Sequence, residues 1–210
     1  MNVLLDLLQT QLGGEQFNQT VSKQLGIEED KAGDAVQAAF SAIMAGLSNN
    51  VAKPEGAQGL LGALDRDHDG SILDDVTGYL TGSMQTSNPN MLNGAGIVNH
   101  VLGGNQSNII ETIAKVTGID SGKAGKLLIT LAPMVLGMIG KMKKTNNVES
   151  STLLDLIMQG GKPQPVQQTQ ATGGGLLGMF GSLLDKNKDG NVMDDIAKTG
   201  INMLLKNFMK

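Results

Sequence analysis

The sequence predicts an all-α protein made of two tandem multihelical units, each with an EF-hand-like acidic loop. Three observations support this: apolar residues recur at helical spacing, short motifs repeat, and an acidic loop stands near the end of each repeat. We predict one unit at residues 1–84, a connection at 85–98 and a second unit at 99–210. With 210 residues, the chain is long enough to bury a sizeable core.

The first unit is predicted to be a succession of helices separated by turn residues. Gly13-Gly14 closes the first helical stripe, and acidic residues at 28–30 begin the third helix, where negative charge is favourable. We expect Ser48-Asn49-Asn50 to end that third helix. The predicted helices are 2–12, 16–25, 28–47, a short helix that opens at Pro54, and 74–80.

The same pattern returns after a connection rich in Ser, Asn, Gly and Pro. The motif G-I-x3-K-A-G begins at Gly26 and again at Gly118, an offset of 118 − 26 = 92 residues. The two acidic loops stand 185 − 65 = 120 residues apart, so the second unit carries an insertion. We predict that this insertion is a disordered low-complexity linker at 160–175, where Pro, Gln and Gly accumulate.

The most apolar segment, residues 127–140, is predicted to be a buried core helix that Pro133 kinks. Its fourteen residues are fewer than the ~20 that an α-helix needs to cross a bilayer. It also occupies the place that an amphipathic helix holds in the first unit. We therefore predict no transmembrane segment, with membrane insertion as the alternative.

Composition restricts the classes of function. The net charge is −4 and no basic cluster is larger than the one at 141–144, so binding to nucleic acid is not expected. Cysteine is absent, which excludes disulfides, thiolate nucleophiles and zinc–thiolate sites. The N-terminus lacks the layout of a secretory signal, and we predict a cytoplasmic protein.

Two acidic loops, residues 65–75 and 185–195, are the candidate functional site. Each reads D-x-[DN]-x-D-G-x-φ-φ-D-D, where φ is apolar. Acidic oxygens at every second position can converge on one cation, and the glycine permits the sharp turn. Oxygen ligands favour calcium (Ca2+), with magnesium or manganese as weaker candidates. The predicted metal ligands are Asp65, Asp67, Asp69, Ser71, Asp74 and Asp75 in the first loop, and Asp185, Asn187, Asp189, Asn191, Asp194 and Asp195 in the second.

The second half of each loop departs from the EF-hand. Position twelve, which an EF-hand fills with a bidentate Glu, is Val76 in the first loop and Ile196 in the second. The sequence leaves open whether Asp74 or Asp75 completes the metal coordination shell of the first loop. The alternative is that the loops are ion-free turns, because Asp and Asn form turns and cap helices without a metal.

No catalytic group emerges from the sequence. His68 is expected to point outward from the first loop and His100 to lie in a surface turn, so they form no metal pair or acid–base dyad. We predict a non-enzymatic protein with no evident small-molecule substrate, whose partner is another protein or a second copy. It is a calcium-binding interaction or scaffold module; alternatively, it is an ion-free helical protein that self-associates or lies on a membrane surface.

The segments Leu4-Leu5-Asp6-Leu7-Leu8, Leu25-Gly26-Ile27 and the first acidic loop, with the stretch that begins at His100, resemble a bacterial family. This is the domain of unknown function numbered nine hundred and thirty-seven, which is related to the YidB-like proteins. The resemblance implies a multihelical, bacterial and cytosolic protein. It brings no activity, substrate or binding residues, so the functional prediction stays with the loops.

Overall fold

The computed structural model describes residues 14–145 and 148–160, and every regular element in these ranges is a helix. The predicted all-α class is confirmed for these residues. The predicted helix at 2–12, most of the predicted linker, the second acidic loop and the terminal helix after it lie outside them. The elements are α2 (Glu15–Leu25), α3 (Glu29–Val51), α4 (Pro54–Arg66), η1 (Ser71–Asp75), α5 (Val76–Thr81), η2 (Pro89–Leu92), α6 (Gly94–Leu102), η3 (Gly103–Asn105), α7 (Gln106–Thr117), α8 (Ser121–Thr145) and α9 (Ser150–Gly160), where η marks a 3-10 helix.

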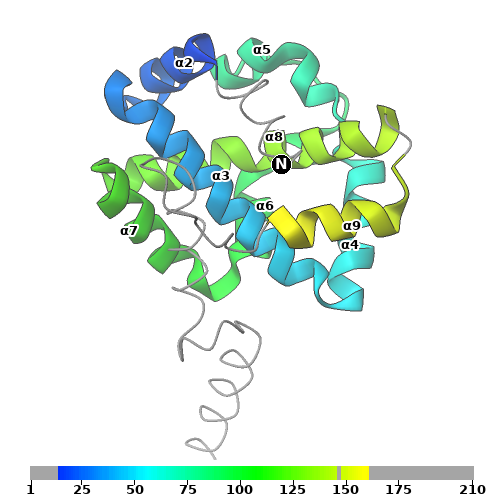
Figure 1. Ribbon diagram of the computed structural model, residues 1–210. Coiled ribbons are helices and arrows are strands. Elements are labelled where there is room, and N and C mark those ends of the chain that lie inside the picture. The colour runs from blue at the N-terminus through cyan, green and yellow to red at the C-terminus, as the bar shows by residue number, and fades with distance from the viewer. Residues whose placement is uncertain (1–13, 146–147, 161–210) are drawn as a thin grey trace, which may run out of the picture.

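Two long helices, α3 and α8, cross at the centre of the fold, and α2, α4, α6, α7 and α9 pack around them (Figure 1). The inner face of α3 is rich in alanine, and Ala35, Ala38 and Ala39 are fully buried. Small side chains on this face let neighbouring helices approach closely, while α8 supplies larger leucines and methionines. One continuous hydrophobic core results, with residues from Phe17 to Ile157.

The apolar segment predicted as a core helix is the middle of α8. By length and composition alone, the stretch Ser121–Lys144 is sufficient to cross a membrane, but 72% of its most apolar window is buried inside the protein. Leu127, Leu128 and Leu131 have no exposed surface. The prediction of a buried core helix is therefore confirmed, and Pro133 lies inside the helix as expected.

Positions 92 residues apart make matching contacts, in line with the repeated motif. Gly26 and Gly118 both end a helix with positive φ, 63° and 68°. The ammonium of Lys123 donates a hydrogen bond to the Gly26 carbonyl oxygen, and Lys31 approaches Gly118 in the reciprocal place. Because α3 and α8 share one core, the two predicted units are joined through their interiors.

The end of α3 differs from the prediction. Ser48-Asn49-Asn50 does not end α3, which continues to Val51. The side-chain amide of Asn50 donates to the Gly46 carbonyl oxygen (2.9 Å), so this residue folds back onto the helix. The chain leaves the helix at Lys53, whose backbone is extended because the following proline disfavours the helical region.

The stretch predicted as a connection, 85–98, carries helical structure. It contains η2 and the start of α6. Asn93 caps α6 by accepting a hydrogen bond from the Gly96 N–H (3.0 Å), and Val98 is buried in the shared core. The Asn- and Pro-rich composition therefore marks helix starts at this point.

Candidate functional site

The first acidic loop joins α4 to α5. Asp65 belongs to the last turn of α4, and Gly70 has a φ of 100°, a left-handed value that glycine adopts without strain. The turn predicted at Gly70 is confirmed. Asp75 caps α5 by accepting a hydrogen bond from the Gly78 N–H (2.8 Å), so this helix starts at Val76, two residues later than predicted.

The backbone of the loop packs directly on α8, at a contact that we call the glycine seat. It consists of Gly137 and Gly140 on α8 and of His68 and Ile72 in the loop. A Cβ atom on Gly140 would collide with the His68 carbonyl oxygen, and one on Gly137 would collide with the Ile72 side chain. Ile72 is fully buried. Glycine is required at both helix positions because the loop lies too close for any side chain.

Three carboxylates of the loop lie beside three lysines at the end of α8, and we call these pairs the charged rim. The Nζ–Oδ distances are 2.6 Å for Lys143 and Asp65, 3.1 Å for Lys144 and Asp69, and 3.4 Å for Lys141 and Asp74. The side chains of Asp65 and Asp74 remain 63% and 73% exposed, so these are surface ion pairs. The lysines reduce the repulsion among the loop acids, which is the role that the sequence pattern assigns to a cation.

Two carboxylates of the loop, Asp67 and Asp69, also accept hydrogen bonds from neighbouring residues. The Asp67 Oδ1 accepts from the side-chain amides of Asn88 (3.2 Å) and Asn90 (3.4 Å). The Asp69 Oδ1 accepts from the Ser71 N–H at 3.1 Å. Hydrogen bonding from Ser71, assisted by Lys144, lowers the pKa of Asp69 to about 2. This carboxylate therefore stays charged well below neutral pH.

The predicted metal ligands of the first loop do not converge on one centre. Within residues 14–145 and 148–160, no three His, Cys, Asp or Glu side chains are grouped so that they could hold a metal ion. The oxygen donors suit calcium by their chemistry. However, Asp65, Asp69 and Asp74 face three separate lysines, so a calcium shell requires these side chains to move. The ligands predicted at 185–195 lie outside the described residues.

His68 is buried, so the prediction that it points outward was wrong. Its residue surface is 4% exposed, and its Nδ1 has no hydrogen-bond partner among the described residues. Burial lowers the pKa of His68, while the charge of Asp67 raises it to a smaller extent. The difference arises because the chain folds back onto α8 directly after α4, which turns position 68 inward. His100, in the last turn of α6, is exposed as expected.

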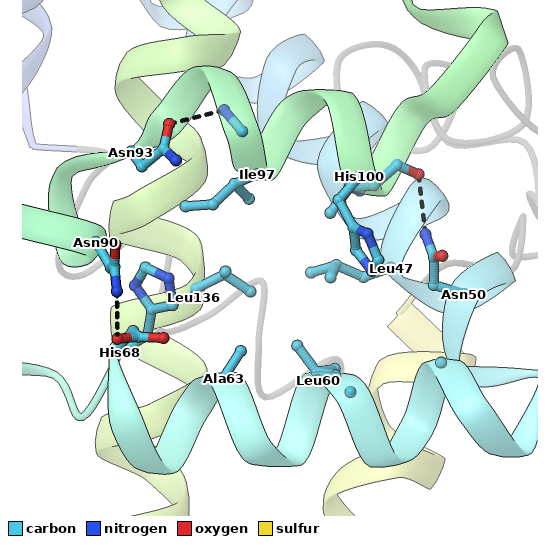
Figure 2. A pocket seen from close by; sticks show the side chains of 15 residues that line it. Leu47, Asn50, Leu60, Ala63, His68, Asn90, Asn93, Ile97, His100 and Leu136 are labelled. Carbon is cyan, nitrogen blue, oxygen red and sulfur yellow. Dashed lines mark hydrogen bonds between the residues drawn. The ribbon is translucent and has the colours of Figure 1, made fainter.

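A cavity of about 420 Å³ lies between α3, α4, α6 and α8, on the His68 side of the loop. Figure 2 shows His68 and Asn90 at one end and Asn50 and His100 at the other, with apolar side chains between them. This volume is typical of small-molecule sites. The lining residues are Leu47, Asn50, Gly56, Gly59, Leu60, Ala63, Asp67, His68, Asn90, Asn93, Gly96, Ile97, His100, Val101 and Leu136.

Sequence reasoning missed two parts of this region. The first is the pairing of the lysines at 141–144 with the acidic loop about seventy residues earlier in the chain. No sequence pattern near either segment indicates this pairing. The second is the cavity, which a sequence pattern does indicate. Small residues at helical spacing, Gly56, Gly59 and Ala63, share one face of α4.

The comparisons with known proteins assign a family but no activity. Neither the search of curated proteins nor the search of solved structures gave a match. A match to the family described as "Bacterial protein of unknown function (DUF937)" covers residues 6–142, more than half of the chain. This span contains the glycine seat and also the first acidic loop, Leu25-Gly26-Ile27 and the stretch that begins at His100, which carry the resemblance in the sequence. The chain therefore belongs to the DUF937 family of bacterial proteins of unknown function.

Proposed function

We propose that this chain is a non-enzymatic helical interaction or scaffold protein in which the first acidic loop fastens the α4–α5 corner onto α8. The observation that carries the proposal is the charged rim, where three loop carboxylates meet three lysines at one end of α8. These acids serve as ion-pair partners, and Asp75 serves as a helix cap. Structural roles of this kind favour a scaffold over a reaction centre.

The scaffold holds its corner mainly through shape. Exposed ion pairs contribute about 0–1 kcal/mol each, whereas a buried isoleucine contributes several times as much. The hydroxyl of Tyr79 adds a hydrogen bond from α5 to the Thr130 carbonyl oxygen of α8 (2.9 Å). We propose that the rigid surface formed in this way meets a protein partner or a second copy of the chain in the cytoplasm.

Calcium binding by the loop is the second candidate function. It is favoured by the alternating acids, by the left-handed Gly70 and by the exposure of the carboxylates, which leaves them accessible to an ion. In this account, calcium competes with the lysines, and Asp65, Asp69 and Asp74 turn away from α8 to form the shell. Magnesium and manganese would compete less well, because a flexible oxygen shell suits the larger ion.

A calorimetric titration of the full chain with calcium separates the two candidates. A calcium loop gives measurable heat and a higher melting temperature than in chelator, and the variant K141Q/K143Q/K144Q then binds calcium more tightly because its competitors are gone. If the loop is held by the lysines without a metal ion, the calcium titration gives no heat. The variant K141Q/K143Q/K144Q then loses hydrogen-exchange protection in α5.

Two matched acid variants show which loop responds. D65N/D69N/D74N removes charge from the first loop, and D185N/D189N/D194N does the same in the second. If the lysine variant leaves both calcium affinity and α5 protection unchanged, neither role holds for the first loop. Sedimentation of the full chain at several concentrations then tests self-association independently.

A further inference from the structure

The cavity between α3, α4, α6 and α8 is bordered by small residues on one face of α4. Gly56, Gly59 and Ala63 follow one another at spacings of three and four residues, so they share the side of the helix that faces the cavity. A Cβ atom on Gly59 would meet no atom of the described residues within 4 Å. A space of about 420 Å³ is many times the roughly 30 Å³ that one water molecule occupies. It is of a size to hold a small organic molecule.

One end of the cavity presents hydrogen-bond acceptors. The imidazole of His68 lines it and is 4% exposed, and its Nδ1 has no partner within the described part of the chain. The carboxylate of Asp67, the neighbouring residue, also lines the cavity and accepts a hydrogen bond from the Asn90 amide. The Asp67 carboxylate offers only acceptors, whereas a neutral imidazole carries one donor and one acceptor nitrogen. A ligand group that donates a hydrogen bond therefore fits this end.

The charge of Asp67 also restricts the ligand. A second carboxylate placed beside it would be repelled, and the repulsion is strengthened by the low polarity of the cavity. The walls between the two polar ends are aliphatic, from Leu47, Ile97 and Leu136. An apolar body and a neutral donor group match these two features.

We propose that this cavity is a binding site for a small apolar molecule with a neutral hydrogen-bond donor, such as an aliphatic alcohol. The hydroxyl donates to the Asp67 carboxylate beside His68, and the alkyl chain lies along the aliphatic walls. This site is separate from the charged rim, since Asp65, Asp69 and Asp74 do not line it.

The test compares 1-octanol with octanoate, which has the same chain length, by titration of the full chain followed by NMR. Octanol is expected to bind at least tenfold more tightly than octanoate and to shift the imidazole signals of His68. Equal or tighter binding of octanoate overturns the proposal, and so does the absence of octanol binding.

Two glycine variants of α4 locate the site. Gly59→Leu fills the cavity and is expected to weaken octanol binding at least tenfold. Gly62→Leu makes the same change on the same helix at a residue that does not line the cavity, where a Cβ atom meets only the Arg66 side chain, and is expected to bind octanol as the original chain does. Melting curves of both variants verify that they are folded.

A third variant, Asp67→Asn, keeps the size of the side chain and removes its charge. It is expected to reduce the preference for octanol over octanoate. Unchanged octanol binding in Gly59→Leu, together with an unchanged preference in Asp67→Asn, would place the alcohol elsewhere and refute the site.

Discussion

The glycine seat and the charged rim attach the same loop to the same helix, but they differ in what each contact can tolerate. In the seat, backbone meets backbone with no room for a methyl group, and Ile72 is fully buried. In the rim, flexible lysine and aspartate side chains meet at the surface, where water and salt weaken their attraction.

This difference separates what fixes the position of the loop from what adjusts it. A contact that depends on shape fails when one atom is added or removed, because the packed interior relaxes only partly. A contact between exposed charges can exchange one cation for another at little cost. The glycine seat therefore determines the position of the loop on α8, and the charged rim is where an ion or a partner can bind.

The largest expected effect is in the seat, at Ile72. Replacement by alanine should lower the free energy of unfolding by about 3 kcal/mol, because it leaves a cavity beneath the loop. Ile72→Val, which removes one methylene, should cost about 1 kcal/mol. Urea unfolding followed by circular dichroism measures both. Equal losses in the two variants would contradict the buried position of this side chain.

Gly140 tests the seat from the side of the helix. Gly140→Ala should destabilise the protein by about 2 kcal/mol, because the new methyl group meets the His68 carbonyl oxygen. The same change at Gly62 has space around it and should be neutral or stabilising by up to about 1 kcal/mol, since alanine favours the helix. Thermal unfolding compares the two; a stabilised Gly140→Ala would mean that no close contact exists there.

Asp75 lies between the two regions and should have an intermediate effect. Asp75→Ala removes the cap of α5 and should cost about 1 kcal/mol. Asp75→Asn keeps a capping oxygen and should be nearly neutral. Hydrogen exchange of the α5 amides shows where the loss occurs. If both variants are equally destabilised, then the charge of Asp75, and not the hydrogen bond that caps α5, contributes to stability.

The smallest expected effect is in the rim, and it depends on pH. The folded-state pKa of Asp69, about 2, lies below its ordinary value of 3.8. The charged carboxylate therefore stabilises the fold above about pH 4, and this contribution disappears as the pH falls toward 2. The melting temperature should exceed that of Asp69→Asn at pH 5.5, and the difference should vanish near pH 2. A difference that grows in acid would contradict the lowered pKa.

The sequence predicted the parts of this fold that depend on local pattern. Helical periodicity identified α3 and α8, and the helix predicted at 16–25 ends at Leu25, where the structure ends α2. The end of α3 was missed because Pro54 outweighs the Ser-Asn-Asn signal before it.

The candidate site was predicted only in part, because its arrangement depends on distant contacts. The turn at Gly70 follows from the loop motif alone. The inward position of His68 depends on Gly140, and the pairing of Asp65 depends on Lys143, each more than seventy residues away. A pattern of acidic residues in the sequence does not show whether their charge is neutralised by lysines or by a metal ion.

The crossing of α3 and α8 also determines how the molecule unfolds. Each helix buries its inner face against the other, Lys123 donates a hydrogen bond to the Gly26 carbonyl oxygen, and Lys31 lies near Gly118. A fragment that ends at residue 84 would leave the alanine face of α3 in water, with no internal substitute for α8. Folding should therefore be cooperative across residues 14–160, with one calorimetric transition and no independently stable half.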